Sequence, residues 1–245
     1  MSSGKQRRLV PRHWVRWLVA GVAVVAAVAV GGPFAYIHFV ESKAPSPLSL
    51  GKSSSSAQPV SSTSSTPSSF VSLAGTWTAA SGSEVGYRVQ EVLFGQQHTA
   101  VGRTSSVTGH LTIQGTTVTA GTLSAAMATV ASDQSQRDAQ FRGRIMDTGA
   151  YPTATFTLTR TIALAPVPAS GVTRSYTVHG NLTLRGKARP VTFQLAARQT
   201  TGTIKLSGSI PVVFADWGIP NPSFAGVVAT QDHGVLEFLL TLRHT

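Results

Sequence analysis

The chain of 245 residues contains no cysteine and carries a formal net charge of +11. The absence of cysteine excludes disulfides, thiol nucleophiles, cysteine metal sites and lipid attachment through cysteine. The charge does not indicate nucleic-acid binding. Residues 1–72 hold seven Lys/Arg against one Glu, and the thirteen basic and eight acidic residues that follow are scattered along the chain.

Residues 17–40 predict a membrane-spanning helix. These 24 residues contain no Asp, Glu, Lys or Arg, and roughly 20 apolar residues suffice to cross a bilayer. The basic tail of residues 1–16 predicts a cytoplasmic N-terminus and an extracytoplasmic C-terminal domain, anchored in the plasma membrane by a single pass. A cleaved signal peptide is the alternative, since Ala27-Val28-Ala29 fits a cleavage site, but the apolar run continues well beyond a typical signal core.

Residues 41–72 are expected to form a linker. Positions 53–69 contain ten Ser, two Thr and two Pro, a composition that buries too little apolar surface to offset the entropy of ordering. As a flexible coil, the 31 residues from Ser42 to Ser72 would reach on the order of 30 Å from the membrane.

Residues 73–245 predict an all-β domain, because apolar and polar residues alternate with period two. The clearest strand runs from Tyr176 to Leu184, and Arg185-Gly186-Lys187 then predicts a hairpin turn. Similar patterns give about eight antiparallel strands. Such a domain is either a sandwich, whose own side chains fill the core, or a closed barrel wide enough for one small ligand, and periodicity does not separate the two.

One short helix is expected between Asp133 and Met146. The apolar residues there are spaced as on a helix, and Ser135 with Asp138 matches a capping box. The next strand should begin after Tyr151-Pro152, since a residue before proline favours extended geometry.

The outer domain lacks a recognisable catalytic or metal-binding pattern. Its histidines, His98, His110, His179 and His233, are far apart and fit no metal motif. Nucleophile elbows, phosphate-binding glycine loops and locally paired carboxylates are missing as well. The adjacent pair Arg137-Asp138 is interpreted as a structural feature of a helix end. We therefore predict no catalytic residue, no metal site and no required cofactor.

Large apolar side chains fall on the faces expected to point inward, where small residues alternate with them. Gly180, Gly208, Ala125 and Ala154 should leave space inside a barrel. The inward aromatic residues also include Phe224.

The outer domain resembles the YceI-like, polyisoprenoid-binding family from about Leu73 to Leu242. The segments that carry the resemblance are Gly75-Thr76-Trp77, Arg137-Asp138 through Phe141, Met146-Asp147, Tyr151-Pro152 with Phe156, Gly180 through Gly186 with Pro190-Val191, and Phe214 through Ile219. The resemblance implies a lipocalin-like barrel whose lumen takes an isoprenoid quinone or polyprenyl lipid. The anchor, the Ser-rich linker and a loop at Ala165–Ser170 depart from the family pattern.

The sequence thus favours a membrane-tethered lipid-binding module. Its candidate lumen residues are Tyr87, Phe141, Phe156, Leu158, Leu182, Leu184, Phe193, Phe214, Trp217 and Phe238. The alternatives are a cell-surface interaction domain with a packed core and, third, a hydrolase or other enzyme. The sequence indicates neither an oligomeric state nor a protein partner.

Overall fold

The computed structural model describes residues 44–51, 73–93, 95–223 and 228–245. They belong to one compact unit that begins at Ala44. The predicted tail and span, residues 52–72 of the predicted linker, and Phe224 lie outside the described residues. Within the described ranges, no helix combines the length and apolarity needed to cross a bilayer.

Twelve strands and four short helical segments make up the described unit. The strands are β1 (Gly75–Ala79), β2 (Glu84–Leu93), β3 (Gln96–Thr104), β4 (Val107–Gln114), β5 (Thr117–Ala126), β6 (Thr153–Leu158), β7 (Ile162–Ala163), β8 (Thr173–Leu184), β9 (Lys187–Thr200), β10 (Thr203–Val213), β11 (Val228–Thr230) and β12 (His233–His244). The helical segments are η1 (Met127–Thr129), α2 (Ser135–Gln140), η2 (Phe141–Ile145) and η3 (Phe214–Trp217).

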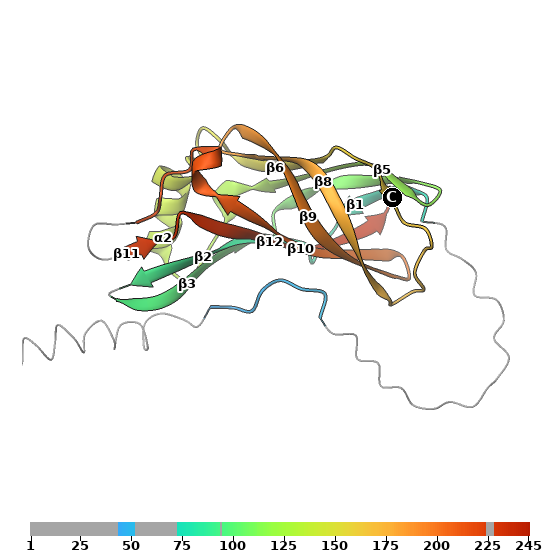
Figure 1. Cartoon of the computed structure of the whole chain (residues 1–245), viewed down its shortest axis with the longest axis horizontal. Coiled ribbons are helices and arrows are strands. Elements are labelled where there is room, and N and C mark those ends of the chain that lie inside the picture. The colour runs from blue at the N-terminus through green and yellow to red at the C-terminus, as the bar shows by residue number, and fades with distance from the viewer. Residues whose placement is uncertain (1–43, 52–72, 94, 224–227) are drawn as a thin grey trace, which may run out of the picture. The chain divides into compact units, whose positions relative to one another are not determined.

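Eight of the strands close into an antiparallel barrel, drawn in Figure 1. The ring runs β1-β4-β5-β6-β8-β9-β10-β12, and pairing of β12 with β1 closes it. The alternation in the sequence did not distinguish a barrel from a sandwich, because closure depends on contact between the first and last strands of the ring. The structure therefore confirms the predicted all-β barrel with one short helix.

Strands β1 and β2 lie one after the other along the same edge of β12. Residues 242–244 of β12 pair with β1 and residues 235–239 pair with β2, which in turn pairs with β3. Between the two strands, buried Ser83 donates its hydroxyl to the Thr241 carbonyl at 3.1 Å and accepts the Thr241 amide at 3.0 Å. These two bonds hold the turn on the barrel wall.

The hairpin of β8 and β9 contains the predicted turn. Leu184 pairs with Lys187, and the two residues between them both have positive φ, 46° at Arg185 and 72° at Gly186. Two successive positive φ angles are typical of the two-residue turn whose twist matches antiparallel strands.

The predicted helix is present, but its predicted capping box is wrong. The α-helix α2 continues into a π-helical turn, η2, and Gln134 rather than Ser135 occupies the N-cap. The Asp138 carboxylate instead accepts the amide of Ser132 at 2.8 Å and its hydroxyl at 2.6 Å. Asp138 is therefore engaged with the chain before the helix and cannot complete a box with Ser135.

The alternation in β10 predicts a strand through Phe214, but β10 ends at Val213. Phe214–Trp217 form a 3-10 helix that ends at Gly218, whose φ of 63° is left-handed. Both Phe214 and Trp217 remain buried there, because a 3-10 turn can direct two large side chains to the same interior as the strand before it.

Candidate functional site

The barrel contains an apolar cavity of about 290 Å³. Residues from seven of the eight ring strands, all except β1, line it together with residues of β2, β3 and the helical segments. Typical small-molecule pockets measure roughly 300–1,000 Å³ and are mainly apolar, with few polar groups. The interior is therefore not completely filled by its own side chains and has room for an apolar ligand.

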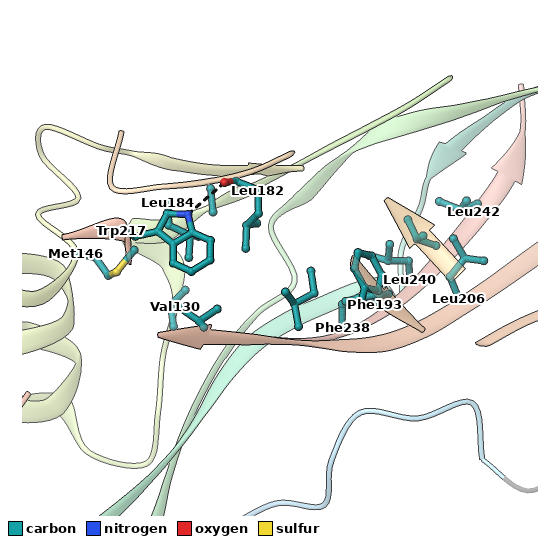
Figure 2. Close-up of a cluster of buried hydrophobic side chains, with 14 of the residues drawn as sticks. Val130, Met146, Leu182, Leu184, Phe193, Leu206, Trp217, Phe238, Leu240 and Leu242 are labelled. Carbon is teal, nitrogen blue, oxygen red and sulfur yellow. Dashed lines mark hydrogen bonds between the residues drawn. The ribbon is translucent and has the colours of Figure 1, made fainter. Parts of the chain in front are cut away.

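Nine of the ten candidate lumen residues line this cavity. They are Tyr87, Phe141, Phe156, Leu158, Leu182, Leu184, Phe193, Phe214 and Phe238. Trp217 is buried but is not part of the lining. Its indole Nε1 donates to the backbone carbonyl of Leu182 at 3.2 Å, the dashed line in Figure 2, so Trp217 fastens η3 to β8.

Three phenylalanines form an edge-to-face chain inside the barrel. Phe193 lies between Phe156 and Phe238, with ring centroids 5.5 and 5.8 Å apart and interplanar angles of 72° and 80°. A Cβ atom at Gly180 would lie 2.2 Å from Phe156, and one at Gly208 would lie 2.7 Å from Phe238. The prediction that these glycines leave space is therefore corrected, because each glycine accommodates a phenylalanine ring. Of the four predicted small residues, Ala125 and Ala154 do line the cavity.

One corner of the cavity is charged. Among the described lining residues, only Glu91 and Arg137 carry a formal charge, and Arg137 Nη2 donates to Glu91 Oε1 at 3.2 Å. The same carboxylate oxygen lies 3.2 Å from His98 Nδ1, and Arg137 also pairs with Asp133. The corner is thus an internally paired cluster. Arg137, predicted to be structural, does serve as a structural partner, but it also faces the lumen.

Tyr87 lies beside this charged corner. Its ring stacks on Phe141 with centroids 5.2 Å apart and an interplanar angle of 16°. Burial raises the pKa of the Tyr87 hydroxyl above its usual value, the Arg137 guanidinium opposes this shift, and nearby carboxylates add to it. Tyr87 is therefore a neutral hydrogen-bonding group at the lumen wall. Sequence reasoning missed Glu91, although it follows Tyr87 and Val89 in the alternation of inward positions.

The four histidines lie on four different strands, β3, β4, β8 and β12. His179 Nδ1 lies 3.0 Å from Thr192 Oγ1, and His233 Nδ1 lies 2.7 Å from Asp232 Oδ1. No three His, Asp or Glu side chains within the described ranges gather into a group that could hold a metal ion.

Comparison with known proteins gives one family and several similar folds. The model of the YceI-like domain matches residues 77–242. A polyisoprenoid-binding domain from Saccharophagus degradans, implicated in plant cell wall breakdown, has a TM-score of 0.58 at 16% identity and covers 70% of this chain and 99% of that domain. BcnA from Burkholderia cenocepacia has a TM-score of 0.49 at 22% identity, covering 63% and 95% of the two chains. No curated protein matches the sequence significantly.

Proposed function

The chain belongs to the YceI-like domain family, and on this premise we propose that its barrel binds an isoprenoid lipid in the lumen. The observation that carries the proposal is the apolar cavity of about 290 Å³ inside the barrel. A cell-surface interaction domain would instead fill its core completely. The polyisoprenoid-binding domain from Saccharophagus degradans has the same fold, which supports this class of ligand.

The lining supplies enough apolar contact for such a ligand. Burial contributes about 0.8 kcal/mol per CH₂ group, so a five-carbon isoprene unit contributes about 4 kcal/mol. A few units therefore exceed association costs of about 4–15 kcal/mol. Contacts of this kind tolerate differences in ligand shape and do not select one isoprenoid over another.

The charges along the lumen favour an uncharged head group. Glu91 and Arg137 already pair with each other, so the lining offers no net positive charge to a phosphate or pyrophosphate. Burying an uncompensated charge is costly. The proposed ligand is therefore an isoprenoid quinone, or another neutral-headed isoprenoid, rather than a polyprenyl phosphate with its head inside the barrel.

The proposed setting is the outer face of the plasma membrane. Residues 17–40 have the length and composition of a spanning helix, and the tail before them is basic. A tethered binder would exchange lipid with the membrane that holds it.

Lipid extraction from the purified barrel unit, residues 44–245, tests the proposal. We expect mass spectrometry of the organic extract to find an isoprenoid at near one per protein, and emptied protein to take up added quinone in preference to polyprenyl phosphate. Repeated recovery without stoichiometric lipid, together with no uptake of quinone, would contradict binding. Preference for the phosphate would contradict only the neutral head group.

A further inference from the structure

A short segment before β1 lies against the outer wall of the barrel. Residues 44–51, here called the strap and drawn in blue in Figure 1, were expected to be part of a free linker. They form hydrogen bonds with two strands of the ring, β9 and β12, and with β2 and β3 beside it. Leu48 and Leu50 are half-buried. These eight residues have no regular secondary structure, but they are hydrogen-bonded to the barrel unit.

The strap contacts four strands of the sheet. Arg103 of β3 and Arg88 of β2 donate to the carbonyls of Ser46 and Pro45 at 2.5 and 2.6 Å. The Leu48 amide donates to Glu237 Oε2 of β12 at 3.3 Å. Further along, Arg198 of β9 donates to the Gly51 carbonyl at 2.8 Å. Since β10 lies between β12 and β9, the strap spans five adjacent strands.

Glu237 is the centre of this contact. Its neighbours Leu236 and Phe238 line the cavity, so its own side chain is on the outer face, yet only 3% of it is exposed. Arg103 Nη2 pairs with the carboxylate at 2.8 Å, and Arg88 Nε pairs with it at 3.4 Å. A buried carboxylate is costly unless it is paired and hydrogen-bonded.

The strap completes the hydrogen bonding of this ion cluster. The two arginines that neutralise Glu237 have further N–H donors, which point to strap carbonyls, and the strap returns one amide to the carboxylate. The cluster thus has complementary partners in the backbone of this particular segment. Outward-facing ion pairs usually contribute little when solvated, but these are covered.

We infer that the strap is a docking element that holds the barrel close to the membrane surface. The inference rests on the proposed membrane span. Only residues 41–43 separate that span from the strap, and three extended residues reach about 10 Å. Residues 52–72 then connect the strap to β1 and add nothing to the tether length while the strap is docked. Release of the strap lengthens the tether to roughly 30 Å.

The docking itself is tested in the full-length protein by thiol labelling. The chain has no cysteine, so Leu50→Cys provides a unique probe in the strap. We expect Glu237→Gln and, separately, Leu48→Pro to raise its labelling rate by at least about tenfold, because reactivity follows the undocked population. Glu84→Gln is the matched control, since it removes another carboxylate that approaches Arg103, at 3.9 Å.

Leu48→Pro removes the strap amide without altering any barrel residue, so it keeps the test informative if Glu237→Gln fails to fold. Equally fast labelling in all variants, including the unaltered strap, would overturn docking.

The tethering is tested in proteoliposomes. A donor dye on Thr201→Cys and an acceptor lipid report the distance from the bilayer. Leu48→Pro should reduce energy transfer at least about twofold as the tether lengthens, whereas Glu84→Gln should leave it unchanged. Protease access to a C-terminal tag on spheroplasts is measured in parallel. If the tag is protected, the proposed membrane placement fails, while labelling still decides docking. If the tag is accessible and labelling responds but energy transfer does not, the tethering inference is overturned.

Discussion

Replacing Leu182 by tryptophan should abolish the proposed lipid binding while the barrel stays folded. Leu182 is 3% exposed, lines the cavity and pairs with Phe156 of β6. A larger indole group at this position must enter the lumen. Overpacking costs about 1–3 kcal/mol where no free volume exists, which is less than the total stability of about 5–15 kcal/mol typical of a domain. The cavity should reduce that cost further.

The loss in binding should be much larger than the loss in stability. Displacing one five-carbon isoprene unit forfeits about 4 kcal/mol, or roughly a thousandfold in Kd. Thr183→Trp is the matched control, because successive strand residues point to opposite faces and Thr183 is on the outside. Quinone titration and thermal melting of both variants decide the matter. If Leu182→Trp melts far lower yet retains the lipid, or both variants behave alike, the assignment of Leu182 to a ligand cavity is wrong.

Two further predictions follow from buried groups in the lumen. Gly180→Ala should destabilise the barrel by about 1–3 kcal/mol, because its Cβ would meet the Phe156 ring. Gly143→Ala is the control: its Cβ would meet nothing within 4 Å, so the substitution should be neutral or stabilising by up to about 1 kcal/mol. Equal denaturant midpoints for the two variants would contradict the contact between Gly180 and the Phe156 ring. Tyr87 should lower the stability of the protein at high pH. Burial raises the pKa of its hydroxyl in the folded state, so the unfolded chain loses the hydroxyl proton at a lower pH. The free energy of unfolding should therefore fall by up to about 1.4 kcal/mol per pH unit above pH 10. Tyr87→Phe should show a shallower slope in denaturant melts between pH 9 and about 11.5, and an identical slope would refute the buried hydroxyl.

Local patterns were sufficient to predict most of the strands. The stretch from Tyr176 to Leu184 alternates without interruption, and Gly186 marks its turn, so neither depends on distant residues. Closure of the ring could not be predicted in this way, because it depends on Trp77 meeting His244, a pairing between the two ends of the domain. The sequence pattern also extended the strand β10 through Phe214, which instead belongs to the 3-10 helix η3. The pattern could not show this, because a strand and a 3-10 helix would both bury the Phe214 side chain.

The lumen was predictable in composition but not in arrangement. Phe193 and Phe238, which were selected by their inward parity, line the cavity. The fit of Phe238 against Gly208, however, joins positions thirty residues apart on the neighbouring strands β12 and β10. The strap was missed for a related reason. Its Pro and Ser content predicts coil, and its partner Glu237 lies 189 residues away from Leu48, where no local signal connects them.

The long strand β12 follows every other ring strand in the sequence and is the neighbour of both β1 and β10. During synthesis, those two strands must therefore wait with open edges until residues 233–244 emerge, and open edges recruit other chains. The carboxylate that the strap covers, Glu237, arrives on the same late strand. The ring thus closes and the strap gains its acidic partner in one final step, so an incomplete chain has neither a closed ring nor the carboxylate that the strap covers.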